Sequence, residues 1–507
     1  MTVVATGFAS TRATSPPSPA PSRALVLGAV LVTLLALIIR FSTLTLQSLW
    51  LDEAYTDHLV HLGLGAMLSA IPRSESTPPL YYLIVWGWTH VFGYSELALR
   101  SVSAIAGVAT VTVAYALAAR LAGTRAAVIA GLLGAVSPLM IWYSQEARAY
   151  SLAALLATGT ILCLVRYLDT LDRRWLAGWV VTAALGLCTH YFVGFVVLPE
   201  VVWLIWRERS RRAVTVGAGL VVVVALALVP LALAQRGTGH ADYIALGGLG
   251  RRAVQVPKQF LVGYASPSQG ITASLATLIV LAGSVWPLAR HRAGLDRSTL
   301  IPLAAGLCGV LVPLGLAIGG ADFLDTRNVL PALPALLVVA AVGFAAPRTW
   351  PRGGVLAGGL TAVLAVVVLL VDTHAAYQRP DWRGASQALG AATGPRAIVV
   401  TPGSALLPLQ AYESGLAPLV GSARVREVDV VGLASQSGTR LGTVPTPTAP
   451  FGIPPQFHLL GASRNRLFIV LRFRAATPVA VSAPTLGPSH LGAGGYAILL
   501  QVPPRSG

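Results

Sequence analysis

Residues 24–41 read ALVLGAVLVTLLALIIRF, an apolar run long enough to cross a bilayer as a helix. Runs of the same kind recur along the first three quarters of the chain. The 507 residues are 55% hydrophobic and only 11% charged, whereas a soluble domain carries about 25% charged residues. Lipid offers the backbone no hydrogen-bond partners, so each run must form a helix. The sequence therefore predicts an all-α polytopic membrane protein.

The first run has two interpretations. A short apolar run near the N-terminus is also typical of a signal peptide. This one has no convincing small-x-small cleavage site, and many more apolar runs follow it. We therefore expect an uncleaved first span. Before it, residues 1–22 are rich in Ser, Pro, Ala and Thr, which predicts a disordered cytoplasmic tail.

The arginines indicate the topology. Arg-rich loops alternate with Arg-poor ones, and basic short loops stay in the cytoplasm. The net charge of +17 falls in these loops, so we expect no nucleic-acid partner. Placing the basic loops inside leaves the N-terminus inside and the last residues outside. It predicts eleven transmembrane helices, at 24–41, 101–119, 126–142, 149–166, 175–189, 192–206, 214–234, 271–289, 299–319, 328–346 and 353–371.

The transmembrane domain is thus expected to cover residues 23–371, with a first outward loop at 42–100. Within that loop, residues 78–92 are apolar and aromatic. Counting them as a span would reverse the side of every later basic loop. We therefore predict an amphipathic helix along the outer membrane surface, with its Tyr and Trp residues at the interface.

Residues 372–507 differ in composition from the rest. Strand-like runs at 396–401, 466–473 and 496–502 alternate with Pro- and Gly-rich stretches. They predict a small extracytoplasmic α/β domain.

The first outward loop carries an acidic pair, Asp52 and Glu53, shortly after the first span. Adjacent carboxylates at a membrane surface repel each other and are costly to desolvate, which favours a functional role. Trp50 would hold them near the headgroups. Such a carboxylate could act as a general base that takes a proton from an acceptor hydroxyl as the hydroxyl attacks an anomeric carbon. A solvated acidic loop explains the same residues equally well.

Most other unusual polar residues fall on the same predicted face. The candidates for substrate binding are Tyr82, Glu146, Arg148, His190, Tyr191 and Arg327. Arginine is a natural partner for a lipid phosphate, so the outward cations predict a phosphate or diphosphate receptor made by Arg148, Arg327, Lys258, Arg251 and Arg252. The alternatives stay open: Arg148 could pair with Glu146, and His190 could be structural. The stretch Glu75–Tyr82 could simply start a helix.

Several common catalytic motifs are absent from the sequence. We find no Walker loop, dinucleotide-binding glycine motif, zinc-type His/Cys cluster or nucleophile elbow. Cys163, Cys188 and Cys308 lie in apolar runs without metal-ligand spacing, which favours packing. We therefore expect no cofactor and no metal, and an activated sugar would have to arrive attached to lipid.

The motifs together resemble a known family. They are SLWLDEAYT (48–56), ESTPPLYYLIVWGWTHVFGYSELALRSVSAIAG (75–107), SPLMIWYSQEARAYSL (137–152), THYF (189–192), DTRNVLPALPALLVVAAVGFA (325–345) and QRPDWRGASQAL (378–389). They are similar to the bacterial, actinobacterial-type proteins of glycosyltransferase family 39, which are mannosyltransferase-like members of the C-type glycosyltransferase superfamily. The resemblance is best over residues 45–205.

This resemblance implies a C-type glycosyltransferase fold and a metal-independent, inverting transfer of a sugar from a polyprenyl-phosphate donor on the extracytoplasmic face of the cell membrane. It makes Asp52 the catalytic base with Glu53 beside it, and Arg148 or Arg327 a ligand of the donor phosphate. One departure matters. Thr77 precedes the Pro pair where relatives often carry His or Lys, so Arg73 or another Arg must supply that charge.

The acceptor, whether protein, glycan or lipid, and the sugar are open, with mannose the default. Two other functions are compatible with the sequence. A lipid or solute transporter predicts ionisable residues near mid-membrane and internal repeats, and the apolar runs are nearly free of acids. A non-catalytic envelope assembly protein could keep the fold, but the retained acidic pair favours an enzyme.

Overall fold

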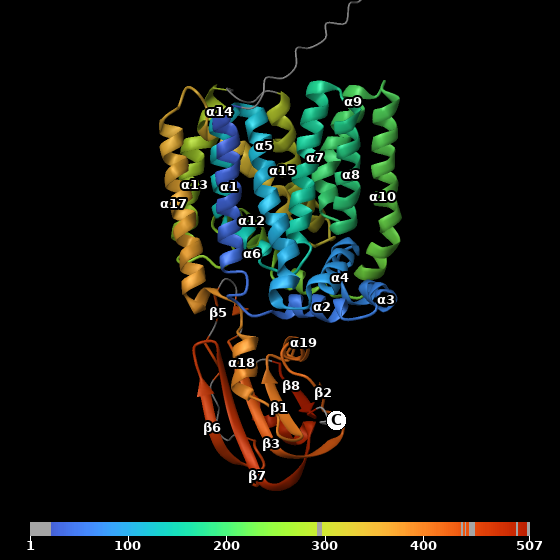
Figure 1. Ribbon diagram of the computed structural model, residues 1–507, viewed down its shortest axis with the longest axis vertical. Helices are drawn as coiled ribbons and strands as arrows, with labels where there is room; N and C mark the ends of the chain where they lie inside the picture. The colour runs from blue at the N-terminus through green and yellow to red at the C-terminus, as the bar shows by residue number, and fades with distance from the viewer. Residues whose placement is uncertain are drawn as a thin grey trace, which may run out of the picture.

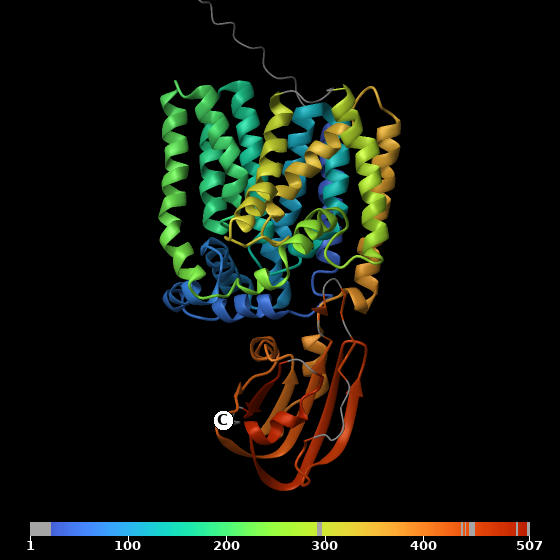
Figure 2. The ribbon, with the colours of Figure 1, turned by 180° about the vertical axis from the view of Figure 1, so that it is seen from behind.

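A computed structural model describes residues 22–291, 297–434, 436–437, 440–441, 443–445, 452–492 and 495–503. The expected tail, except for Ser22, lies outside the described residues. The chain forms a bundle of long helices, with a separate sheet-containing domain against one end of it (Figure 1; Figure 2). The sequence-based prediction of a helical membrane domain followed by a small α/β domain is confirmed.

Each predicted span contains helix. The long elements are α1 (Arg23–Ser42), α5 (Glu96–Val136), α7 (Tyr150–Thr170), α8 (Arg173–Thr189), α9 (Val193–Glu208), α10 (Arg212–Arg236), α13 (Gln269–Val280), α15 (Arg297–Ile318) and α17 (Arg352–Thr373). Shorter ones complete the bundle: α6 (Pro138–Ser144), η1 (Leu281–Val285), α14 (Trp286–His291), η2 (Leu330–Ala332) and α16 (Leu333–Phe344). Within the described ranges, seven helices are long and apolar enough to cross a membrane, so the protein is a multi-pass membrane protein. The count of eleven stays a prediction.

Helix α5 contains two predicted spans in one element of 41 residues. Its φ and ψ angles leave the helical region at Ala122 and Gly123, and Gly123 has a φ of +75° that glycine adopts without strain. The two arms fold back on each other, and Gly131 of the second arm packs against Tyr115 of the first. The break coincides with the short basic loop that the arginines predicted.

Arg40, near the end of α1, is completely buried inside the bundle. Its guanidinium donates to the carbonyls of Gly134 and Ala135 at 3.1 Å each and to the Ser144 hydroxyl at 3.2 Å. Carbonyls at a helix end have no partner within the helix. Arg40 therefore satisfies the end of α5 and joins α1 to it.

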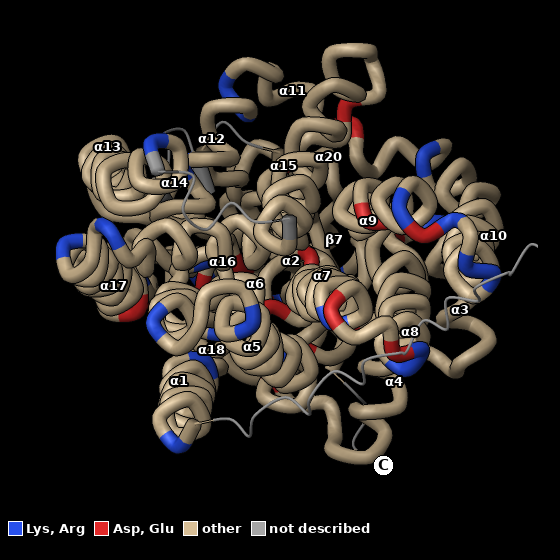
Figure 3. Tube along the Cα trace, turned by 90° about the horizontal axis from the view of Figure 1, so that it is seen from above, with Lys and Arg blue, Asp and Glu red and all other residues tan. Residues whose placement is uncertain are grey.

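The charged residues of the bundle are concentrated at helix ends. Viewed from above, Lys and Arg lie at the ends of α1, α10, α14 and α17 (Figure 3). Glu200 is an exception within α9: it is 1% exposed and accepts from Trp179 Nε1 at 2.6 Å and from the Thr160 hydroxyl at 2.9 Å. The apolar runs are therefore not free of buried acids, and this one is satisfied by neutral donors.

Residues 42–100, the loop predicted to be outward, form α2 (Leu51–Val60), α3 (Leu64–Ser74), α4 (Leu80–Phe92) and the start of α5 at the end of the bundle that faces the C-terminal domain (Figure 1). The helix predicted over residues 78–92 is present. Its place along the membrane surface stays a prediction, whereas Tyr81 and Tyr82 are fully buried within the protein. Tyr81 bonds the Ser103 hydroxyl at 2.8 Å and so ties α4 to α5.

The C-terminal domain contains a six-stranded sheet in the order β2-β8-β1-β3-β7-β6. Its strands are β1 (Arg396–Thr401), β2 (Leu416–Pro418), β3 (Ser422–Leu433), β6 (His458–Arg464), β7 (Phe468–Ser482) and β8 (Ala497–Gln501). Strand β1 pairs parallel with β3, and the other pairs are antiparallel. The three predicted strands correspond to β1, β7 and β8. Helices α18 (Trp382–Leu389) and α19 (Leu406–Gln410) lie on the side toward the bundle (Figure 1).

Arg396 anchors α18 to this sheet. It is 1% exposed and donates to the carbonyls of Leu389 and Gly390 at the end of α18, at 2.8 and 2.9 Å. It also pairs with the buried Asp429 of β3 at 3.2 Å. The C-terminal end of α18 is therefore fixed to the sheet.

Candidate active site

A cavity of about 540 Å³ lies between the α2–α3 region and the adjoining ends of α9, α10 and α15. Several residues predicted for the site line it, namely Asp52, Arg148, His190, Tyr191 and Arg327. These residues are far apart in the sequence. The predicted residues Glu53, Glu146 and Tyr82 are fully buried behind its wall.

Asp52 lies in the first turn of α2, and its carboxylate faces the cavity. A helix N-terminus favours a negative charge at this position. Asp52 Oδ2 accepts from Arg327 Nη1 at 2.5 Å. Burial favours the neutral acid, but the positive charges of Arg327 and Arg148 outweigh it and hold the pKa of Asp52 below its ordinary value. The carboxylate is therefore ionised at neutral pH and able to accept a proton.

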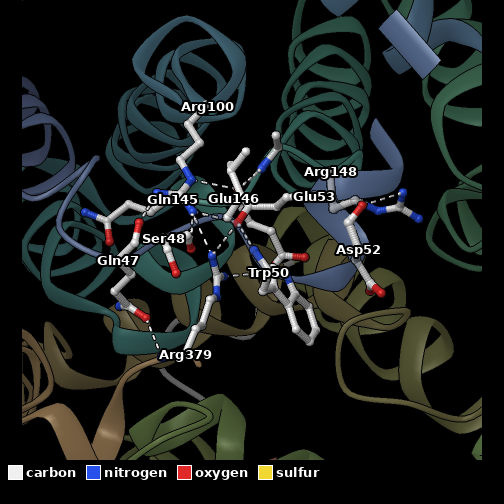
Figure 4. A network of polar contacts seen from close by, with 12 residues as sticks. Gln47, Ser48, Trp50, Asp52, Glu53, Arg100, Gln145, Glu146, Arg148 and Arg379 are labelled. Atoms are coloured by element: carbon white, nitrogen blue, oxygen red, sulfur yellow. Dashed lines mark hydrogen bonds and ion pairs between the residues drawn. The ribbon is translucent and has the colours of Figure 1, made fainter. Parts of the chain in front are cut away.

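Glu53 has a different environment from its neighbour. Its Oε1 accepts from Arg100 Nε at 2.7 Å and from the Ala147 N–H at 2.9 Å. Its Oε2 accepts from Arg100 Nη2 at 2.6 Å and from Arg379 Nη1 at 3.1 Å (Figure 4). Both oxygens are occupied, so the geometry favours a positioning role for Glu53 over the predicted catalytic one.

Arg100 connects Glu53 to the segment that leads into α2. It is 1% exposed and donates to the backbone carbonyls of Leu44, Gln47 and Ser48 at 2.9, 2.7 and 2.9 Å. One buried guanidinium thus fixes both the start of α2 and the chain before it. This arrangement sets the direction in which Asp52 faces.

Glu146 pairs with an arginine from the start of the C-terminal domain. Arg379 Nη2 donates to Glu146 Oε2 at 2.7 Å, and the guanidinium lies over the Trp142 ring at 4.6 Å. Burial raises the pKa of Glu146 to about 7 against the opposing effect of Arg379. The nearby carboxylates of Glu53 and Asp52 contribute to this raised pKa.

The expected alternative partner of Arg148 was Glu146, and this is wrong. Arg148 Nη2 pairs with Glu75 at 2.8 Å, at the end of α3. Glu75 also accepts from the Tyr82 hydroxyl at 2.5 Å. Tyr82 therefore holds Glu75 in place from behind the cavity wall. Glu75 in turn fixes the position from which Arg148 reaches the cavity.

The predicted phosphate receptor differs from the observed one in two ways. Some of the predicted cations are occupied or lie away from the cavity, and one arginine that was not predicted lines it. Arg252 forms a double ion pair with Asp322 and donates to the Leu324 carbonyl at 2.7 Å, so it is already occupied. Arg236, at the end of α10, lines the cavity and has no carboxylate partner among the described residues. Arg73, Arg251 and Lys258 are not among the described residues that line it.

His190 and Tyr191 form the turn between α8 and α9. The Tyr191 hydroxyl donates to Gln235 Oε1 at 2.7 Å, which fixes the end of α10 next to the turn. His190 is 2% exposed, and its Nδ1 accepts from the Phe192 N–H at 3.2 Å. The turn therefore gives the cavity a rigid wall.

Sequence reasoning did not select Arg100, Arg379, Glu75 or Arg236 as site residues. Each lies on the face predicted to be outward, where the positive-inside preference makes an arginine unusual. That signal identified Arg327 and could have identified the other arginines. Glu75 could not be found in this way, because its role depends on a contact between α3 and the turn before α7.

A cluster of four acids at the site is matched by arginines. Each acid of the cluster has at least one arginine partner: Asp52, Glu53, Glu75 and Glu146 pair with Arg327, Arg100, Arg148 and Arg379. Among the described residues, no group of three or more His, Cys, Asp or Glu could hold a metal ion. The arrangement offers an ionised carboxylate and several guanidinium groups to one cavity, which suits a substrate with both a hydroxyl and an anionic group.

Comparisons with known proteins identify a similar family and a similar fold. Residues 76–233 match the family described as dolichyl-phosphate-mannose-protein mannosyltransferase. ArnT from Cupriavidus metallidurans bound to undecaprenyl phosphate shares the fold, with a TM-score of 0.51 at 14% identity over 87% of this chain and 97% of that one. Its apo structure gives 0.53 at 12% identity over 89% and 98%. No curated protein matches the sequence.

The chain therefore has the C-type glycosyltransferase fold. Over residues 76–233 the chain is similar to a mannosyltransferase family, in line with the resemblance of its motifs.

Proposed function

We propose that the protein transfers a sugar, with mannose the default, from a polyprenyl-phosphate donor to an acceptor on the extracytoplasmic side of the cell membrane. The observation that carries this proposal is the cavity in which ionised Asp52 adjoins Arg148 and Arg327. A family described by a dolichyl-phosphate-mannose donor and a similar fold that binds undecaprenyl phosphate support the donor class.

The proposed reaction is a single displacement with inversion. The acceptor oxygen forms a bond to the anomeric carbon while the bond from that carbon to the phosphate oxygen breaks. Asp52 takes the acceptor proton, and the arginines stabilise the negative charge that develops on the departing phosphate. No covalent intermediate with the protein is required. The acceptor is a protein, a glycan or a lipid.

The apolar wall of the cavity fits a prenyl chain. Phe192 and Phe195 continue from the His190 turn, and Leu233 and Leu316 follow on α10 and α15. The two leucines are 62% and 44% exposed, so they offer an apolar surface to a lipid tail. A lipid tail can therefore leave the cavity toward the membrane while its phosphate stays at the arginines.

Transfer itself is the first test. Purified protein is incubated with radiolabelled undecaprenyl-phosphate mannose, or with a pentose donor in parallel, and with membranes of the producing strain as the acceptor source. We expect label to move into the acceptor fraction, and Arg327→Gln to reduce the rate by about 100-fold, the usual effect of removing one charge-stabilising donor. Arg120→Gln removes an exposed arginine paired with Asp169 and serves as the control. An unchanged rate in Arg327→Gln would reject the phosphate role of Arg327.

The side of the membrane is tested separately. Ser76 is exposed and lines the cavity, so Ser76→Cys in a chain without its native cysteines reports on the cavity mouth. We expect a membrane-impermeant thiol reagent to label it in intact cells. Labelling only after the cells are broken would reverse the topology and the proposed side of transfer.

A further inference from the structure

The imidazole of His190 has only one protein partner. Its Nδ1 accepts a hydrogen bond from the Phe192 N–H at 3.2 Å, so the ring proton of the neutral form is on Nε2. Nε2 is buried and has no hydrogen-bond partner among the described residues. His190 itself is 2% exposed and lines the cavity. An unpaired N–H in such a position is uncommon and calls for a ligand.

The groups around the ring determine which ligand fits. Arg148 and Arg327 approach from the turns before α7 and η2, and Tyr150 of α7 lies 5.6 Å from the ring centroid. Burial and these two positive charges lower the pKa of His190 to about 3. The ring is therefore neutral over the physiological range. It cannot exchange a proton with substrate there, but it can donate a hydrogen bond at any such pH.

We propose that the Nε2–H of His190 donates a hydrogen bond to a phosphate oxygen of the lipid-linked substrate. This inference rests on the proposed function. A phosphate group between Arg148 and Arg327 offers oxygens to both guanidinium groups and to the imidazole, and a bond to an anionic acceptor is stronger than one to a neutral acceptor. The neutral ring adds a directed donor without a third charge. The competing acceptor is a hydroxyl of the sugar.

Two substitutions separate this role from a structural one. In His190→Asn, the side-chain oxygen can replace Nδ1 as the acceptor for the Phe192 N–H, but the donor at Nε2 is lost. In His190→Gln, the side-chain amide can reach the position of Nε2 and donate, but the acceptor for Phe192 is displaced. A ligand-binding role therefore predicts that His190→Gln binds the lipid phosphate more tightly than His190→Asn. A structural role predicts the reverse order.

The test measures binding of sugar-free undecaprenyl phosphate to the purified full-length protein. We expect His190→Asn and His190→Ala to weaken binding about 10-fold or more, and His190→Gln to stay within about 3-fold of the original protein. His458→Ala, in exposed strand β6, is the matched control. Thermal unfolding in detergent checks that each variant is folded.

Other outcomes overturn the inference in distinguishable ways. Equal binding by all variants, or better binding by Asn than by Gln, rejects the phosphate contact. Normal binding of undecaprenyl phosphate with weakened binding of the mannose-linked form assigns the contact to a sugar hydroxyl instead. If the original protein binds neither lipid, the proposed function itself fails, and the His190 assignment falls with it.

Discussion

Asp52→Asn is expected to lower the rate of sugar transfer by at least about 100-fold, the usual contribution of a general base. The amide keeps the size of the side chain and can still accept a hydrogen bond from Arg327, which contacts Asp52 at 2.5 Å. It cannot accept the proton of the acceptor hydroxyl. Binding of undecaprenyl phosphate should change much less than the rate, because Asp52 acts on the acceptor.

The same assignment predicts the pH dependence of transfer. The base must be ionised, and the pKa of Asp52 lies below its ordinary value because of Arg327 and Arg148. Activity is therefore retained down to about pH 4, near the ordinary pKa of an aspartate, and falls below that. Initial rates measured across the acid range check this.

Asp57→Asn is the matched control, since Asp57 lies later on α2 and pairs with His61. It should transfer sugar at nearly the original rate. A folded Asp52→Asn protein that transfers sugar normally would disprove the base assignment. An equal loss in both variants would indicate that α2 needs its negative charge for stability, and Asp52 would no longer be singled out.

The membrane architecture was predictable because the hydrophobic effect acts over whole segments. A run such as residues 24–41 needs no tertiary information to be recognised as a helix, and α1 occupies almost the same residues. The arginine distribution added the break inside α5 that hydropathy alone would miss. Strand β6 escaped prediction because it is exposed along its length and lacks an alternating apolar pattern.

The site was predictable only in part, for a physical reason. Asp52, Arg148 and Arg327 are unusual where they stand, so each could be noticed alone. Their partners are fixed by tertiary contacts between segments far apart in the sequence, such as Arg327 with Asp52, 275 residues away. No local pattern distinguishes a carboxylate that faces the cavity from its neighbour that faces the protein. Glu53 was therefore predicted to be catalytic together with Asp52.

Arg379→Met is expected to destabilise the protein by about 3 kcal/mol or more, the usual effect of leaving a buried ion pair without one partner. Arg379 is 3% exposed and contacts Glu146 at 2.7 Å and Glu53 at 3.1 Å. Without it, Glu53 keeps Arg100 as a partner, but Glu146 is left without an arginine. Thermal unfolding in detergent, followed by transfer assays on the folded fraction, measures the loss.

The pH dependence of this loss identifies Glu146 as its source. The pKa of Glu146 is already about 7, and removing Arg379 raises it further. A raised pKa makes the folded protein less stable as the pH rises through it. The destabilisation should therefore be smaller at about pH 6 than at about pH 8, whereas a pure packing defect would be the same at both.

A second substitution tests whether charge is the cause. In the double variant Arg379→Met with Glu146→Gln, the uncompensated carboxylate is gone, so much of the lost stability should return. Arg383→Met is the matched control: its side chain is 32% exposed and pairs with Glu96, which predicts a change below about 1 kcal/mol. Arg379 precedes α18, which the sheet holds through Arg396. Recovery in the double variant would therefore mean that the C-terminal domain supplies the charge that Glu146 needs beside the active site. Without recovery, Arg379 would have a packing role alone.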